Sequence, residues 1–299
     1  MNLTTMRLKL SSKNLAKAAL KLFPLILFLS ACTSSTSPSF LRENIAQAVK
    51  DIAKAEYKLD ISAKLTDNTL WVYMPLEDIV TKPPKPEKYI ERFLLEDKKN
   101  SLNEKVLKIN YFITPTAEKE KQQDMILDKT VNEKIFYLLQ VIRRVLFSID
   151  NSKEDRPLFF CIVTADIKNG FEIKQIFHLM DLKKLSYGFI SQAEYMHRII
   201  QDTTVSAQII GDKDGNHLDY HKIGLEEFIA DQIQGRIKLK FQKPEVEKNA
   251  DIDKEVLKII TYTLNTYGFK DITLVEIWNQ ATGKKSILNQ KAVLADSKE

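Results

Sequence analysis

The stretch LFFCIVTADIKNGFEIKQIFHLM, residues 158–180, decides most of what the sequence indicates about the fold. Its first part, 158–164, is a continuous apolar run that is typical of a buried strand, and 171–180 is the predicted partner strand. Asn169-Gly170 between them is a strong signal for a tight hairpin. Upstream, Thr130 and Glu133 form a capping box ahead of a broadly apolar helix predicted over 131–149. This part of the chain therefore has the order helix, strand, strand.

The same order is predicted twice more. Leu41, Ile45, Val49 and Ile52 recur at helical spacing to about residue 56, and strand patterns follow over 59–65 and 69–74. Near the end of the chain, a helix over 253–267 stops at Gly268 and precedes strands over 272–279 and 285–294. Three such units predict an α+β fold in which antiparallel sheets are covered by helices. The units share no residue-level identity, so whether they form a true repeat stays open.

The segments between these units complete the expected organisation. We expect an N-terminal α+β region over 40–115, a central α+β region over 116–243 and a C-terminal helix plus hairpin over 244–299. The other predicted elements are a helix over 87–98, a strand over 106–113, a charged stretch over 116–129, a helix over 192–202 after a Ser191–Glu194 capping box, strands over 203–210 and 216–223 around Asp214-Gly215, a helix over 225–234 that stops at Gly235, and an extended segment over 236–241.

The N-terminus carries a separate signal. Its first 21 residues contain lysine and arginine but no acidic residue, an apolar run occupies 22–29, and Leu29-Ser30-Ala31-Cys32 follows. Residues 22–31 are too few to cross a hydrocarbon core, which takes about 20 residues. This arrangement resembles the signal peptide of bacterial lipoproteins. The resemblance implies that 1–31 are removed, that Cys32 becomes the acylated first residue, and that 32–39 are a flexible tether.

The same resemblance implies a location. Two acyl chains suffice for stable membrane anchoring, and the seven residues 33–39 reach about 23 Å when extended. We therefore expect a folded body held close to a membrane of the cell envelope. Because Thr33, not Asp, follows Cys32, the common sorting rule implies the outer membrane, facing the periplasm, if the host has two membranes.

The charge of the chain limits its possible partners, and its cysteine content limits its possible disulfides. Residues 1–31 hold five basic residues, so the 45 basic residues of the whole chain fall to 40 in the mature protein, equal to the 40 acidic ones. A nucleic-acid partner would require a retained basic excess, and we expect none. Cys161 is the one other cysteine besides Cys32, which excludes a disulfide framework within the chain. The apolar neighbours of Cys161 predict that its side chain is buried and does not act as a nucleophile.

Short catalytic signatures are absent from the sequence: it contains no glycine-rich phosphate loop, Gly-x-Ser-x-Gly elbow, His-Glu-x-x-His or paired cysteine motif. Three other patterns suggest chemistry. His217, Asp219 and His221 alternate as metal ligands on one strand face would, and a set of carboxylates and an amide resembles a calcium loop. Trp71 and Tyr73 would share a strand face as a stacking platform. The oxygen-rich set comprises Asp212, Asp214, Asn216 and Asp219.

Each of these patterns has a simpler explanation, which we favour. A solvent-facing hairpin strand accounts for the histidines, a turn between two strands accounts for the carboxylates, and a half-buried sheet face accounts for the aromatic pair. We therefore predict a hairpin over 203–223 that holds no metal. No catalytic residue, cofactor or metal ligand is predicted, and Cys32 is the one assigned site.

Two classes of function remain. The first is a non-catalytic envelope lipoprotein that binds or assembles other envelope proteins or the cell wall, and we favour it. The alternative is a lipid-tethered hydrolase of wall, glycan or lipid substrates. A cleft in which two or more of the four histidines converge with carboxylates of shifted pKa would favour the hydrolase. These histidines are His178, His197, His217 and His221.

Overall fold

The computed structural model describes residues 40–81, 87–96, 98–123, 126–149, 156–242 and 246–295. The chain divides into two compact units, 1–39 and 40–299, and all of the described residues belong to the second. The predicted signal peptide, Cys32 and the tether lie outside the described residues.

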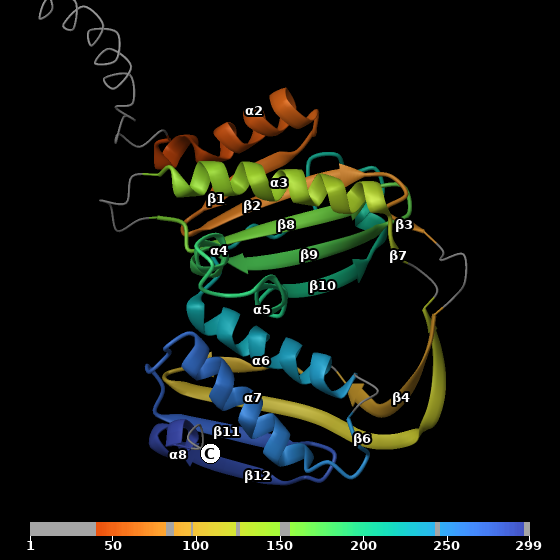
Figure 1. Cartoon of the computed structure of the whole chain (residues 1–299), viewed down its shortest axis with the longest axis vertical. Coiled ribbons are helices and arrows are strands. Elements are labelled where there is room, and N and C mark those ends of the chain that lie inside the picture. The colour runs from red at the N-terminus through yellow and green to blue at the C-terminus, as the bar shows by residue number, and fades with distance from the viewer. Residues whose placement is uncertain are drawn as a thin grey trace, which may run out of the picture. The chain divides into compact units, whose positions relative to one another are not determined.

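The first sheet has five strands, in the order β1-β2-β8-β9-β10 (Figure 1). β1 with β2, β8 with β9 and β9 with β10 are antiparallel, whereas β2 and β8 are parallel. The sheet is therefore mixed, with its parallel pair inside. The strands are β1 (Ser62–Thr66), β2 (Thr69–Leu76), β8 (Phe159–Asp166), β9 (Phe171–His178) and β10 (Ile200–Val205).

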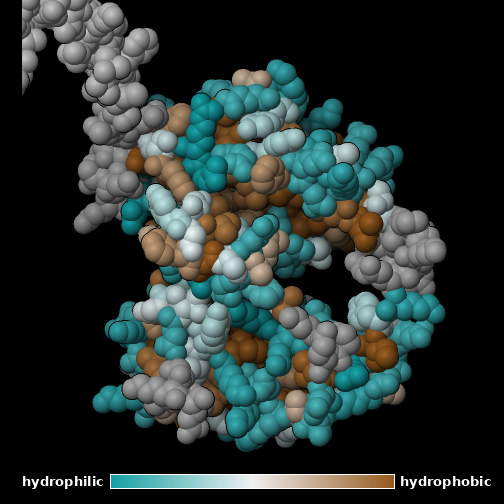
Figure 2. Space-filling view, in the orientation of Figure 1, coloured by the Kyte–Doolittle hydropathy of each residue, from teal (hydrophilic) through white to brown (hydrophobic). Residues whose placement is uncertain are grey.

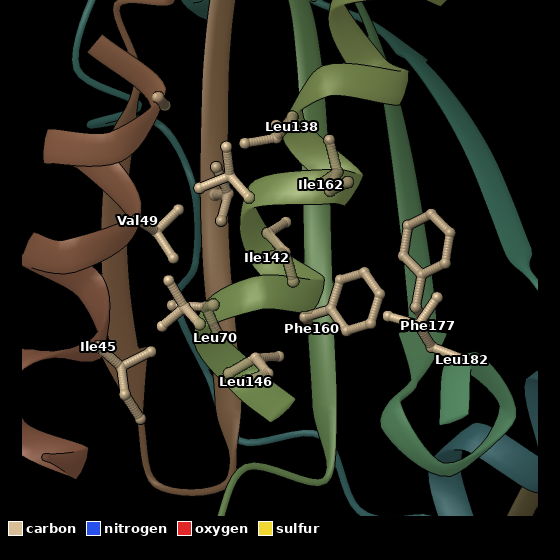
Figure 3. Packing of buried hydrophobic residues seen from close by; sticks show 14 of the residues in the cluster. Ile45, Val49, Leu70, Leu138, Ile142, Leu146, Phe160, Ile162, Phe177 and Leu182 are labelled. Atoms are coloured by element: carbon tan, nitrogen blue, oxygen red, sulfur yellow. The ribbon is translucent and has the colours of Figure 1, made fainter. Parts of the chain in front are cut away.

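Two helices cover one face of the first sheet, α2 (Ile45–Tyr57) and α3 (Lys129–Phe147). Figure 3 shows Val49 of α2 and Ile142 of α3 directed toward the strands, where Phe160 stacks on Phe177 with ring centroids 4.6 Å apart. These side chains belong to one cluster of buried apolar residues. Apolar burial of this kind contributes about 1.5–3 kcal/mol for each large side chain.

The second sheet follows the order β12-β11-β6-β4, and β5 also pairs with β6. β11 and β6 are parallel, and the other pairs are antiparallel. Its core includes side chains from α6 (Leu225–Phe241) and α7 (Ile252–Thr266), and Figure 1 shows both helices beside these strands. The remaining elements here are β4 (Glu87–Glu96), β5 (Ser101–Asn103), β6 (Val106–Gln123), β11 (Leu274–Asn279), β12 (Lys285–Asn289) and α8 (Gln290–Ala295).

The face of the first sheet opposite α2 and α3 is covered by chain that follows β10. Trp71, Tyr73 and Cys161 point to this face and pack in one cluster with Ile209 and Phe228. The smaller elements are η1 (Arg42–Asn44), the paired strands β3 (Val80–Thr81) and β7 (Ile126–Leu127), α4 (Leu179–Ser186), α5 (Gln192–Met196) and η2 (Ala207–Ile209). Both faces of the first sheet are thus buried over its central strands.

The α+β class predicted from the sequence is confirmed, and so is the helix-strand-strand order of its three units. They are α2-β1-β2, α3-β8-β9 and α7-β11-β12. Each of the two large sheets joins two groups of antiparallel strands through one parallel contact, β2–β8 or β6–β11. The expected regions 40–115, 116–243 and 244–299 lie within one compact unit, and both sheets take strands from more than one of them.

Several predicted elements are wrong. The segment predicted as a helix over 87–98 contains strand β4, and the charged stretch after 116 continues strand β6 to residue 123. Phe93 of β4 is fully buried in the core of the second sheet. Across the pair, Lys88 lies 3.0 Å from Glu120. Cross-strand charge pairs and the buried Phe93 side chain stabilise this segment as a strand, although its composition also suits a helix.

The predicted end of a helix at Gly235 is also wrong, because α6 continues to Phe241. Ile229, Ile233, Ile237 and Phe241 follow each other at intervals of four and are all buried in the second core. Burial of this helical stripe outweighs the cost of about 1 kcal/mol for an interior glycine. The alternation that predicts an extended segment over 236–241 is therefore part of a helical face.

The hairpin predicted over 203–223 does not form. β10 pairs with β9 instead, and no strand occurs over 216–223. The predicted helix over 192–202 ends at Met196, although its Ser191 cap forms as expected, with the side chain accepting the Glu194 N–H at 3.1 Å. The cap of α3 is Asp128, not Thr130, since its carboxylate accepts the Thr130 N–H at 2.8 Å.

Candidate binding cleft

A cleft of about 720 Å³ lies between the first sheet and α6. Figure 2 shows the surface hollowed between the part that carries β10 and the part that carries α6. The sheet contributes side chains of β9 and β10, the segment between β4 and β5 contributes Lys98 and Lys99, and one face of α6 forms the opposite wall. That wall includes Asp231, Gly235, Lys238 and Gln242, which the helical period places on one side.

Positive charge dominates the lining of the cleft. Five basic side chains and two acidic ones contribute to it. Lys98 is paired with Glu96 at 2.9 Å, and Lys174 is the cross-strand neighbour of Asp202. Within the described residues, Lys99 and Lys174 make no side-chain hydrogen bond or ion pair. The basic residues of the lining are Lys98, Lys99, Lys174, Arg236 and Lys238.

Asp231 is the most perturbed carboxyl group of the cleft. Burial, and then repulsion from Glu227, raises its pKa to about 6, against the attraction of Lys174 and Lys99. A carboxyl group with a strongly shifted pKa inside a cleft is typical of functional sites. At neutral pH it is mostly ionised, and in mildly acidic solution it loses its charge.

Gly235 lies at the middle of the α6 wall. A Cβ placed on it would meet no heavy atom within 4 Å, apart from its own chain neighbours and helix backbone. Glycine inside a helix is unfavourable relative to alanine, and here no close packing requires it. The consequence is a stretch of the cleft wall with no side chain.

A buried ion network attaches α6 to the segment between β9 and β10. Arg198 donates to Asp181 and to Glu194, each at 2.8 Å, and its carbonyl accepts from Gln232 of α6 at 2.5 Å. Tyr262 of α7 donates to the same Glu194 at 2.9 Å. Burial opposes ionisation of Asp181, but contacts with His178 and Arg198 lower its pKa below the ordinary value. Removing one partner of such a buried pair is strongly destabilising.

A second charged cluster lies outside the cleft, at the segment that follows β10. The two ring nitrogens of His217 are both occupied: Nδ1 lies 2.6 Å from Asp212 and Nε2 lies 2.8 Å from Glu172 of β9. Asp212 also accepts the backbone N–H groups of Asp214, Gly215 and His217. Both ring nitrogens of His217 are thus held by carboxylates of the fold. The cluster fastens the segment onto the sheet.

The pKa values of this cluster follow from the same contacts. Burial alone would lower the pKa of His217, but its bonds to Asp212 and Glu172 outweigh burial and raise it. Burial opposes ionisation of Asp212, yet the bonds from His217 and the backbone lower its pKa far below the ordinary value. The Tyr73 hydroxyl donates to the Asp212 carbonyl at 2.6 Å. Burial, and then the charges of Asp212 and Glu172, raises the pKa of that hydroxyl.

The remaining patterns singled out by the sequence are not brought together. His217 and His221 do not share a strand face, because no strand occurs over 216–223. The half-exposed His221 lies against Trp71 instead, with ring centroids 5.4 Å apart. Asp219 contacts His221 and is away from the His217 cluster. In the described part of the chain, no group of three or more His, Cys, Asp and Glu side chains is arranged to hold a metal.

The aromatic pair and the free cysteine are buried. Trp71 is 2% and Tyr73 0% exposed, because the chain after β10 covers them. They therefore do not form an open stacking platform. Cys161 is free and fully buried, and burial raises the pKa of its thiol, as its apolar neighbours predict.

The four histidines do not converge. His178 contacts Asp181 and the ring of Phe159, and His197 lines the cleft, whereas His217 and His221 have the separate neighbours described above. The arrangement expected for the hydrolase is not present among them. Sequence reasoning also missed the residues that do form the cleft, such as Lys174, Asp231 and Gly235. The sequence offered one signal for the cleft, a glycine, Gly235, inside an apolar stripe of helical period.

No family model, curated protein or solved structure matches the chain. Among the described residues, no helix combines the length and apolar character needed to cross a membrane.

Proposed function

We propose that this protein is a lipid-anchored binding protein of the bacterial cell envelope, which holds a partner in the cleft between β10 and α6 without chemical turnover. The cleft carries the proposal, because three of its charged groups, Lys99, Lys174 and Asp231, make no side-chain hydrogen bond or ion pair within the described residues. Its volume lies within the usual range of binding sites.

The anchor is proposed from the resemblance of 22–32 to a lipoprotein signal peptide. Acylation of Cys32 would hold the body within about 23 Å of the membrane when 33–39 are extended. A short tether raises the effective concentration of partners on the same surface. The partners we propose are the membrane, through the lipid, and envelope proteins or the cell wall, through the cleft. An outer-membrane location facing the periplasm applies if the host has two membranes.

The anchor is tested by intact-mass measurement of the mature N-terminus and by fractionation of Cys32→Ser. We expect a diacylglyceryl-modified Cys32 in the wild type, and loss of both the lipid and the membrane association in the variant. An unmodified N-terminus would contradict the anchor.

The cleft is tested by photo-crosslinking in living cells. A crosslinking amino acid replaces Gln242, which lines the cleft, or Gln47, an exposed glutamine of α2 as the matched control. We expect a discrete adduct from position 242 alone. Equal labelling at both positions would contradict a binding role of the cleft.

A second candidate is the hydrolase, and the observation that favours it is Asp231. A carboxyl group that keeps its proton to about pH 6 is suited to donate it to a leaving group. Purified protein is incubated with wall and lipid fractions, beside Asp231→Asn. Product release that disappears in the variant would establish the hydrolase in place of the binding protein.

A further inference from the structure

The outer edge of β10 presents unpaired backbone groups. Ser206 donates its N–H to Gly170 across the β9–β10 pair at 2.9 Å. Hydrogen-bonded and non-bonded positions alternate in an antiparallel ladder, so the N–H groups of Gln201, Thr203 and Val205 point away from β9. The Thr203 N–H accordingly meets the carboxylate of its own neighbour Asp202, at 2.9 Å. β10 ends the strand order of the first sheet, and no sixth strand follows it in the described structure.

This edge is accessible and continues into the cleft. Residues 201–205 are all exposed, and Val205 reaches 77%. Ile200, Gln201 and Asp202 also line the cleft. A free edge of this length is a template for pairing with an extended chain. About six residues of an added strand would span the roughly 20 Å of β10.

Charge indicates which kind of chain fits. The five basic and two acidic side chains around the cleft favour an anionic occupant. Lys99 and Lys174 act on Asp231 only through space, and both are available to pair with carboxylates. Apolar positions also occur in the lining, at Ile176 and Leu239. The surface therefore suits a segment that alternates acidic and apolar residues.

We propose that β10 receives an extended acidic peptide segment of a partner protein as a sixth strand of the first sheet, with acidic side chains of that segment in the cleft near Lys99 and Lys174. This inference rests on the proposed binding function and specifies its partner. Backbone bonds to β10 supply the alignment, and the basic side chains select acidic over basic sequences. Gly235 leaves a stretch of the opposite wall without a side chain.

The test uses the full lipidated chain in nonionic detergent and a fluorescent peptide of alternating glutamate and valine. Peptides with glutamine or lysine in place of glutamate are the matched probes, and binding is followed by fluorescence anisotropy. We expect the glutamate peptide to bind at least about tenfold more tightly than the others, which corresponds to about 1.4 kcal/mol. High salt is expected to weaken its binding. Equal binding of the three peptides would overturn the charge assignment.

Two pairs of variants locate the site. Lys99→Gln with Lys174→Gln is expected to weaken binding about tenfold, or about 1.4 kcal/mol, whereas Lys254→Gln with Lys270→Gln, at exposed positions outside the cleft, changes it little. Thr203→Pro removes one outward N–H at an edge position that tolerates proline and is expected to abolish binding. Thr203→Val keeps the N–H and is expected to bind. If either control lost peptide binding as strongly as its matched variant, the proposed site would be wrong.

A modified probe covers the case in which Thr203→Pro fails to fold. Two versions of the glutamate peptide are N-methylated at alternate residues, one version at the odd positions and the other at the even positions. Each version can then pair as a strand through only one of its two edges. We expect one of the two peptides to lose binding to the wild type and the other to keep it. If both bind as the parent does, strand addition is wrong. If the chain is acylated and crosslinks through position 242 but binds no acidic peptide, this inference fails while the proposed function stands.

Discussion

Replacement of His217 by alanine is the most direct test of the interpretation that this histidine has a structural role. The ring joins Asp212 and Glu172 at 2.6 and 2.8 Å, and its side chain is 10% exposed. Asp212 keeps its backbone N–H donors in the variant. Glu172 is 8% exposed, and no other side-chain partner of it is present in the described residues. The variant therefore leaves one buried carboxylate without compensation.

The expected loss of unfolding free energy in His217→Ala follows from that uncompensated charge. Removing one partner of a buried pair costs about 3–5 kcal/mol, and we expect a loss of about 3 kcal/mol, since each group keeps a small contact with water. The sign of the pH dependence is fixed by the raised pKa of His217. The folded state binds the proton more tightly than the unfolded state, so the stabilisation is complete below the unfolded pKa of about 6.5. It is lost as pH rises through the folded pKa.

The assay is urea unfolding of wild type and His217→Ala at pH values from 6 upward. The difference in unfolding free energy is expected to shrink as pH rises. Glu172→Gln in the His217→Ala background should recover part of the loss, because it removes the uncompensated charge. His197→Ala, at an exposed histidine, is the control and should cost less than about 0.5 kcal/mol. A loss below about 1 kcal/mol in His217→Ala, independent of pH, would refute the reasoning.

Three further predictions concern the backbone, each read as a shift in the urea midpoint. Gly235→Ala is expected to stabilise the protein by about 0.5–1 kcal/mol, because the helix gains alanine and the new Cβ meets no atom within 4 Å; destabilisation would show that the wall is closed there. Gly215→Ala is expected to destabilise the protein by about 2 kcal/mol, because φ is +77° and the new Cβ would lie 2.9 Å from Tyr73 Cγ. Gly211→Ala is the control and should cost less, because Gly211 has a similar φ but open space around the new Cβ. Asp128→Ala removes the cap of α3 and is expected to cost about 1 kcal/mol, whereas an effect equal to that of Thr130→Ala would contradict the assignment of the cap.

Local patterns were sufficient to predict the three helix-strand-strand units. Asn169-Gly170 specifies a turn by its own conformational preferences, and Gly170 has φ +70° in the structure. The stripe that contains Ile45 and Val49 specifies one buried helix face. Such signals depend on residues close in sequence. The parallel contacts β2–β8 and β6–β11 join strands far apart along the chain, and no local pattern indicates them.

The segment after β10 was predicted incorrectly for a related reason. Its alternation and Asp214-Gly215 suit a hairpin, but the Asp212 carboxylate accepts three backbone N–H groups and fixes a compact turn instead. His217 then reaches Glu172, which is 45 residues away in the sequence. A side chain that bonds to nearby backbone competes with strand formation. The choice between the two is made by the distant partner, which the sequence alone does not identify.

The charged side chains of this protein fall into two groups, and the difference supports the assignment of the cleft. In His217, Asp212, Arg198 and Asp181, charge is matched by partners at 2.6–2.8 Å inside the fold. At Asp231, Lys174 and Lys99, no such partner exists in the described residues, and burial leaves Asp231 with a raised pKa. A fold that needed the partly buried Asp231 carboxyl group only for stability would gain more from pairing it or replacing it with an apolar side chain. The unpaired Asp231 carboxyl group beside the open edge of β10 therefore supports the proposed binding role of the cleft.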